Sequence, residues 1–170
     1  MTIAFRSLRD FPPGTITSLL CRAYSAIKHS DPQFWARENP TWEEYDRQVH
    51  DLPETVGSCG FISVLEQAPV GMASWDPRQF PVAAIGHNCV VPPLWGKGYG
   101  STQLRGVLHR LGQLGFRKVR AQTGDQPFFA PARRMYQACG FQRVGKRMVQ
   151  GFPTVGYEAD LLDMVKERGN

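Results

Sequence analysis

Apolar and polar residues alternate in short runs along much of the chain, and a few segments show helical spacing instead. Ile3–Leu8 predicts a short first strand, and the apolar residues between Ile16 and Ile27 recur on one face of a helix. Asp31–Leu52 carries aromatic residues among many charges, and Thr41 followed by Glu44 has the form of a capping box. We therefore expect a second, irregular helical region there.

The middle of the chain predicts three strands and the best-defined helix of the sequence. Cys59–Glu66 and Val70–Trp75 have the pattern of an antiparallel hairpin with its tight connection at Gln67–Pro69, and Ala83–Val91 follows as a third strand. After three closely spaced glycines, apolar residues repeat at helical spacing over Leu104–Leu114, and a glycine ends the run.

The C-terminal part predicts one strand, one helix and two closing strands. Lys118–Thr123 is the strand, and apolar residues mark a helix face over Ala132–Cys139, which a glycine ends. Phe141–Val149 and Thr154–Leu161 are the last two strands. This order of elements predicts an α/β (α+β) fold in which helices pack on a mixed sheet. The length of 170 residues, with no linker or repeat, predicts one domain over residues 1–170.

The charge balance favours an anionic partner but not a long nucleic-acid contact. Lys and Arg number 20 against 15 Asp and Glu, and the net charge of +5 suits nucleic acid, a membrane surface or a phosphorylated cofactor. No run of five like charges occurs, which makes nucleic acid an unfavoured partner. The four cysteines form no C-x-x-C pair, so we expect no metal site, and the absence of long apolar stretches predicts a cytoplasmic protein without membrane contact.

A glycine-rich turn joins the third predicted strand to the best-defined helix. Gly96, Gly98 and Gly100 occupy alternate positions in this turn. Glycine permits positive φ and close approach of a ligand, and the first turn of a helix presents unpaired N–H groups at the positive end of its dipole. Together these features make a pyrophosphate cradle. The spacing matches neither a dinucleotide fingerprint nor a P-loop, and a turn that merely connects two elements is the alternative.

The turn and a downstream segment both resemble motifs of one family. V-x-P-x-x-W-G-K-G-Y-G resembles the acetyl-CoA signature of GNAT acetyltransferases, (Q/R)-x-x-G-x-G/A, with Trp95 where the family usually has Gln or Arg. The second segment is similar to N-x-x-A-x-x-x-Y-x-x-x-G-F, with Tyr136, Gly140 and Phe141 in register and Phe129 in the Asn position. Most phosphate contacts in the family come from backbone N–H groups, so we expect coenzyme binding to survive the change at Trp95.

The resemblance implies a GNAT-like mixed, mostly antiparallel central sheet of six to seven strands flanked by about four helices. It implies an acetyl-CoA-dependent N-acetyltransferase that moves an acetyl group directly to a primary amine in a ternary complex. The acceptor would be a small-molecule amine or a peptide or protein amine, and a homodimer is compatible with this. The coenzyme-binding positions carried over are Asn88, Cys89, Val90, Trp95, Gly96, Lys97, Gly98, Tyr99, Gly100, Ser101, Phe129 and Arg133.

The resemblance also implies two catalytic roles. Tyr136 would protonate the departing coenzyme A thiolate, although without the resemblance its place on an apolar helix stripe would favour a core residue. His87, close in sequence to the acetyl-binding strand, is the candidate general base that deprotonates the amine. His87 could instead be a hydrogen-bonded strand histidine, and Asp76, Glu66 and Asp125 are alternatives.

Several readings stay open at this point. Cys89 could form an acyl-cysteine, but a mid-strand cysteine is more often a small core residue. Arg133 and Arg134 could reach the coenzyme phosphates or form a solvated edge. Trp35, Trp42 and Tyr45 could line an acceptor pocket, although a core role is favoured for at least two of them. A non-catalytic acyl-CoA-binding or sensor domain of the same fold is the alternative function.

Overall fold

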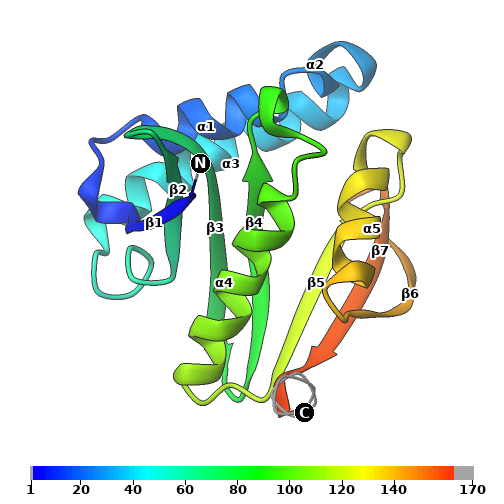
Figure 1. Cartoon of the computed structure of the whole chain (residues 1–170). Helices are drawn as coiled ribbons and strands as arrows, with labels where there is room; N and C mark the ends of the chain where they lie inside the picture. The colour runs from blue at the N-terminus through cyan, green and yellow to red at the C-terminus, as the bar shows by residue number, and fades with distance from the viewer. Residues whose placement is uncertain (1, 163–170) are drawn as a thin grey trace. The chain divides into compact units, whose positions relative to one another are not determined.

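The computed structural model describes residues 2–162, which contain seven strands and five α-helices (Figure 1). The strands are β1 (Ala4–Ser7), β2 (Gly60–Leu65), β3 (Ala68–Gln79), β4 (Val82–Val90), β5 (Lys118–Gly124), β6 (Gln142–Val149) and β7 (Phe152–Asp160). The helices are α1 (Thr15–Ala23), α2 (Ile27–Ser30), α3 (Pro32–Asp51), α4 (Tyr99–Gln113) and α5 (Ala130–Ala138), with short 3₁₀ turns at Leu8–Asp10, Pro92–Leu94 and Pro127–Phe129.

The strands form one mixed sheet in the order β1-β2-β3-β4-β5-β7-β6. β1 with β2, β2 with β3, β5 with β7 and β6 with β7 pair antiparallel, whereas β4 with β5 is parallel. The predicted mixed, mostly antiparallel sheet of up to seven strands is therefore confirmed. The helices number five rather than four because a single turn, α2, separates α1 from α3.

The chain divides into two compact units, and neither is continuous in sequence. Unit 1 contains the described residues up to Ser74 together with His87–Gln103, and unit 2 contains Trp75–Gly86 together with the described residues from Leu104. β3, β4 and α4 each contribute residues to both units. The prediction of a single domain over residues 1–170 stays a prediction.

Unit 1 is held together by the packing of α1 against α3 and by a carboxylate that caps one helix from the other. Leu19, Leu20 and Trp42 are buried in its core. Asp46 on α3 is also buried, and its two carboxylate oxygens accept hydrogen bonds from the backbone N–H groups of Gly14 (3.1 Å) and Thr17 (2.8 Å) at the start of α1. The cap satisfies amides that a helix start leaves unpaired, and the negative charge suits the helix dipole.

The expected capping box at Thr41 is wrong. α3 begins at Pro32, where the Asp31 side chain accepts a hydrogen bond from the backbone N–H of Phe34 at 3.0 Å. The Thr41 hydroxyl donates instead to the backbone oxygen of Glu38 at 2.7 Å, in the middle of the helix. The helix is continuous through Pro40 because Asp31 and Pro32 form a stronger start signal than Thr41 does.

Further boundaries differ from the sequence prediction, and β3 runs to Gln79 rather than ending at Trp75. The β2–β3 turn lies at Glu66 and Gln67, both with positive φ, and β3 already begins at Ala68. Leu114 lies beyond the end of α4 and is exposed, although the sequence placed it on the apolar stripe of that helix. Gly115, which follows with φ of +85°, ends the helical run as predicted.

Unit 2 is built on the β5-β7-β6 part of the sheet, with α5 packed on one face. The Tyr136 ring on α5 stacks on the ring of Tyr157 on β7, with centroids 5.4 Å apart, and Phe141 contacts the edge of Tyr136. Val119 on β5 and Val155 on β7 are also buried. β6 is the edge strand and is exposed along almost all of its length.

Candidate functional site

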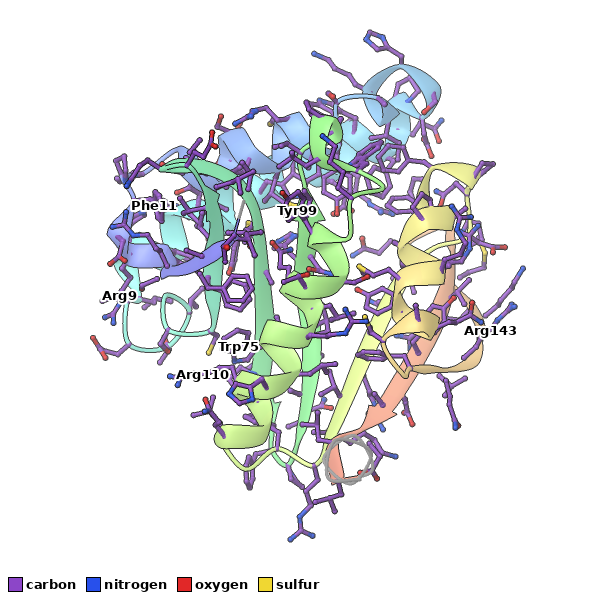
Figure 2. All side chains as sticks on the ribbon, in the orientation of Figure 1. Arg9, Phe11, Trp75, Tyr99, Arg110 and Arg143 are labelled. Atoms are coloured by element: carbon purple, nitrogen blue, oxygen red, sulfur yellow. The ribbon has the colours of Figure 1, made fainter. Side chains whose placement is uncertain are left out.

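The glycine-rich turn of unit 1 is exposed and leads directly into α4. Gly96 and Gly98 have φ of +74° and +83°, and a Cβ placed on either would meet no atom within 4 Å. Tyr99, labelled in Figure 2, begins α4, and Gly100 is helical. The predicted left-handed glycines are therefore two rather than three. The first turn of α4 carries no acidic residue, so nothing there opposes an anion.

Near the end of β4, the strand that leads into the turn, backbone oxygens accept hydrogen bonds from neighbouring side chains. β4 pairs with β5 over Val82–Ala84 and continues to Val90 without a further pair to β5 among the described residues. Near its end the indole Nε1–H of Trp95 donates to the backbone oxygen of Val90 at 2.6 Å. Trp95 is 46% exposed, so its ring is not part of the core.

Gln103 connects the helix, the turn and the strand, and sequence reasoning did not identify it. Its side chain is fully buried on α4, and its amide nitrogen donates to the backbone oxygen of Met72 at 2.8 Å and to the side-chain oxygen of Asn88 at 2.6 Å. The same nitrogen lies 3.2 Å from the backbone oxygen of Cys89, and the Gln103 oxygen accepts from the Ser63 hydroxyl at 2.5 Å. The sequence feature that could have pointed to Gln103 is its position immediately before the apolar stripe that starts at Leu104.

Gly71 on β3 makes room for this network. A Cβ at Gly71 would lie 2.6 Å from the backbone oxygen of Cys89 and 2.8 Å from the side-chain oxygen of Gln103. Both distances are too short for a carbon atom, so any larger residue at this position would displace β4 or Gln103. The glycine is required by close approach and not by its φ angle.

His87 lies on β4 in unit 1, two residues before Cys89. Its backbone N–H donates to the Ser74 hydroxyl at 2.8 Å, and its ring lies against Tyr45 with centroids 5.0 Å apart. Burial lowers the pKa of His87 to about 4. The imidazole is therefore neutral at pH 7, but it is a weaker proton acceptor than a histidine in water.

Tyr45 and Cys89 are both held in their neutral forms. Burial raises the pKa of the Tyr45 phenol to about 12. Burial likewise raises the pKa of the Cys89 thiol to about 12, against the opposing contact with the Met72 backbone. A buried thiol of this kind is not a nucleophile near neutral pH. The core role of Cys89 is thus the one its surroundings favour.

Unit 2 holds the other sequence-predicted site residues. Burial, followed by the neighbouring Tyr157 and Cys139, raises the pKa of Tyr136 well above its ordinary value, so the phenol keeps its proton. Phe129 is buried, and its ring occupies the space that a Cβ on Gly124 would need. Arg133 donates through one guanidinium nitrogen to the backbone oxygens of Gly124 (2.7 Å) and Gln126 (3.1 Å). It therefore ties the start of α5 to the end of β5.

The candidate site residues thus fall into two groups. His87, the end of β4 and the whole glycine-rich turn belong to unit 1, whereas Phe129, Arg133 and Tyr136 belong to unit 2. The aromatic residues Trp35 and Trp42 meet edge to face with centroids 5.3 Å apart, and Trp42 is a core residue.

The alternative carboxylate bases have partners or lie at exposed turns. A hydrogen bond from Arg78 lowers the pKa of Asp76, and a hydrogen bond from Lys146 lowers that of Asp125. Glu66 is exposed in the β2–β3 turn. Carboxylates with lowered pKa values accept protons less readily.

The model of the acetyltransferase (GNAT) family matches residues 20–141, which is more than half of the chain. The chain belongs to the GNAT acetyltransferase family. The match spans both units and includes β4, the glycine-rich turn, α4 and α5. No curated protein matches the sequence.

Solved structures share the GNAT fold with this chain at low sequence identity. PaiA N-acetyltransferase from Thermoplasma acidophilum, solved in complex with coenzyme A, is 13% identical with a TM-score of 0.70, covering 94% of this chain and 99% of its own. Ard1 from Thermoplasma volcanium is 15% identical with a TM-score of 0.70, covering 94% and 98%. An N-acetyltransferase from Staphylococcus aureus Mu50 is 17% identical with a TM-score of 0.64, covering 95% and 99%.

Within residues 2–162 no helix has both the length and the apolar composition that a membrane crossing needs. In the same residues no group of three or more His, Cys, Asp or Glu side chains is placed to hold a metal ion.

Proposed function

We propose that this GNAT protein is an acetyl-CoA-dependent N-acetyltransferase that moves an acetyl group to a primary amine by direct transfer in a ternary complex. The glycine-rich turn carries the proposal. Gly96 and Gly98 carry no side chain in the exposed turn at the N-terminus of α4, and the space beside each is open. Such a turn suits a pyrophosphate, because backbone N–H groups and the helix dipole both favour negative charge.

The residues of the turn and of β4 fit the coenzyme in different ways. The backbone from Trp95 to Ser101 would hold the phosphates, with Lys97 as an exposed cation beside them. Asn88, Cys89 and Val90 would lie along the acetyl and pantetheine part, since β4 has no further pair to β5 beyond Ala84 among the described residues. Acetyl-CoA would supply the acetyl group as a thioester. Phe129 and Arg133 are proposed as further contacts, although Arg133 already binds two backbone oxygens.

Two side chains are proposed to move protons. Tyr136 would hold the proton that the departing sulfur needs, and its raised pKa keeps the phenol protonated through the neutral range. His87 would accept the amine proton, directly or through water, in its neutral form. Direct transfer is favoured over an acyl-cysteine because the Cys89 thiol, with a pKa of about 12, is protonated.

A non-catalytic acyl-CoA-binding or sensor protein of the same fold is the second candidate. The observation that favours it is the weakness of the proton acceptors. Burial lowers the pKa of His87 to about 4, and ion pairs lower those of Asp76 and Asp125. A general base works best when its pKa lies near the working pH.

The first experiment tests the turn with a pair of variants that differ in charge. Gly98→Asp places a carboxylate beside the proposed phosphate site, whereas Gly98→Asn has nearly the same shape, no charge and a similar tolerance of positive φ. We expect calorimetry with acetyl-CoA to show at least a tenfold larger loss of affinity for the Asp variant, corresponding to about 1.4 kcal/mol. Equal affinities for both variants and the wild-type protein would remove the turn from the coenzyme site.

The second experiment separates the enzyme from the sensor. The wild-type protein would be incubated with acetyl-CoA and a panel of small amines, amino acids and peptides with free N-termini, while released thiol is measured. Amine-dependent thiol release is expected of an N-acetyltransferase. Tight coenzyme binding without thiol release for any member of the panel would support the sensor instead.

A further inference from the structure

A hollow lies in the sheet of unit 2, on the face away from α5. Tyr157 on β7 points toward α5, where it stacks on Tyr136, so its neighbours Gly156 and Glu158 face the other side of the strand. Gly156 lies opposite Gln122 of β5 on one side and opposite Gly145 of β6 on the other. Two adjacent strands therefore lack a side chain at the same level of the sheet.

The space over these two glycines is part of a cavity of about 570 Å³. A Cβ on Gly145 would meet no atom within 4 Å, and one on Gly156 would meet only a Val144 methyl, at 3.3 Å, and the Gly145 oxygen, at 3.9 Å. The side chains of Arg120, Gln122, Arg147 and Glu158 also line the cavity. Its volume lies within the range that small-molecule sites occupy. We call this cavity the glycine hollow.

The glycine hollow has one cation more than its ion pairs use. Of the three Lys and Arg side chains that line it, Arg120 pairs with Glu158 at 2.9 Å and Lys146 pairs with Asp125 at 2.7 Å. Arg147 donates instead to the neutral side-chain oxygen of Gln122 at 2.7 Å, and no carboxylate between residues 2 and 162 forms an ion pair with it. A guanidinium keeps its charge at any ordinary pH and presents a planar fork of donors.

Glu158 does not supply the missing negative charge. Lys118 and Arg120 both contact it, at 3.4 Å and 2.9 Å. Burial raises the pKa of Glu158, but hydrogen bonds from Arg120 and Lys118 outweigh this and leave its pKa below the ordinary value. The carboxylate is thus ionised and shared between two cations, so the hollow has no acidic group that calls for a cationic ligand.

We propose that the glycine hollow binds a small organic carboxylate, held by the Arg147 guanidinium. One surplus positive charge matches one carboxylate, and the planar fork of Arg147 matches its two oxygens. Gln122 accepts from Arg147 through its oxygen, which leaves its NH₂ group as a further donor beside the same ligand. All of these residues belong to unit 2, and the proposal does not depend on acetyl transfer.

The test titrates the wild-type protein with acetate, butyrate or benzoate at constant ionic strength. Binding is followed by the chemical shifts of the backbone amides of Gly145 and Gly156. Saturable shifts with a Kd below about 10 mM are expected for at least one carboxylate. Arg147→Gln should weaken that binding by tenfold or more. The matched control is Arg143→Gln, which removes the same charge from the same strand at a residue that does not line the hollow and that Figure 2 labels. It should change Kd by less than twofold.

A second variant tests the shape of the hollow without changing its charge. Gly156→Ala adds one methyl group where only the exposed Val144 side chain must give way, so the fold should persist. We expect it too to weaken carboxylate binding by at least threefold. No saturable shift in the wild-type protein, equal weakening by Arg147→Gln and Arg143→Gln, or tighter binding of inorganic phosphate than of every carboxylate would each overturn the proposal.

Discussion

Tyr136 is a single residue for which a core role and a catalytic role make different predictions. Its ring packs between Tyr157 and Phe141, and its hydroxyl stays protonated because burial raises its pKa. If the hydroxyl protonates the leaving sulfur, Tyr136→Phe should lower kcat by about 10²- to 10⁴-fold, while the affinity for acetyl-CoA changes less than twofold. Steady-state kinetics and calorimetry on the variant would measure both.

The control for Tyr136→Phe is Tyr157→Phe, which removes a hydroxyl from the ring stacked against it. This control should keep the wild-type kcat. Both variants keep their aromatic rings, so the melting temperature should shift by only a few degrees. A wild-type rate in Tyr136→Phe would assign the proton to water or another donor, and a parallel fall in melting temperature would make Tyr136 a core residue.

At the scale of residues, the sequence predicted backbone features better than side-chain contacts. The positive φ of Gly96 and Gly98 followed from their place in a strand–turn–helix segment, because few other residues adopt that geometry. The bond from the Trp95 indole to the Val90 oxygen did not follow, because it depends on how the turn folds back over five residues. The low pKa of His87 likewise depends on burial, which alternation along one strand does not determine.

At the scale of elements, the buried amide of Gln103 fixes α4 to β3 and β4. It bonds backbone oxygens on both strands and the Asn88 side chain on β4. Gln103→Met keeps the length of the side chain but leaves Ser63 and Asn88 without this partner. Because an unsatisfied buried polar group costs about 1–3 kcal/mol, we expect urea denaturation to show a loss of that size in the free energy of unfolding.

The matched control is Gln113→Met at the exposed end of the same helix, which should change the free energy of unfolding by less than about 0.5 kcal/mol. If Gln103 also positions β4, its variant should raise the KM for acetyl-CoA more than Gln113→Met does. A double-mutant cycle with Ser63→Ala would isolate the Ser63–Gln103 bond. Equal stability of the two single variants would show that the network contributes little.

Strands and helices with regular apolar spacing were predicted to within a few residues. The residues that begin a helix were predicted less reliably. α4 and β5 lie where apolar spacing placed them, although α4 starts earlier, at Tyr99. The capping box at Thr41 failed because Asp31 and Pro32 had already started the helix. Signals of this kind compete, and the one at Asp31 and Pro32 comes first along the chain.

At the scale of the whole molecule, the sequence predicted the family and the type of sheet but not the strand order. Two motifs about 30 residues apart carried the resemblance, and the family match over residues 20–141 confirms it. β7 lies between β5 and β6 in the sheet, so the last strand of residues 2–162 is not at its edge. Pairing of that kind is non-local, and hydrophobic alternation in a strand does not specify its neighbour. The site residues stay predictions.

The stability of the molecule should fall in mild acid because His87 is neutral when folded. Its pKa is about 4 in the folded protein against an ordinary value of 6.5, which we take for the unfolded chain. Above pH 6.5 both states are neutral there, and the stabilisation is complete. Between pH 6.5 and pH 4 the unfolded chain binds a proton that the folded protein excludes, so the free energy of unfolding decreases as pH falls.

The prediction is measured as a difference between the wild-type protein and His87→Gln, because other groups also titrate in this range. His87 is half-buried rather than fully buried, so we expect the wild-type protein to lose about 1–2 kcal/mol more than the variant between pH 7 and pH 5 in urea denaturation. His109→Gln, at an exposed position on α4, is the control and should follow the wild-type profile. If the wild-type and His87→Gln profiles are parallel, His87 binds protons equally in both states. It would then be exposed to water when folded, and a histidine of that kind would be the stronger base for acetyl transfer.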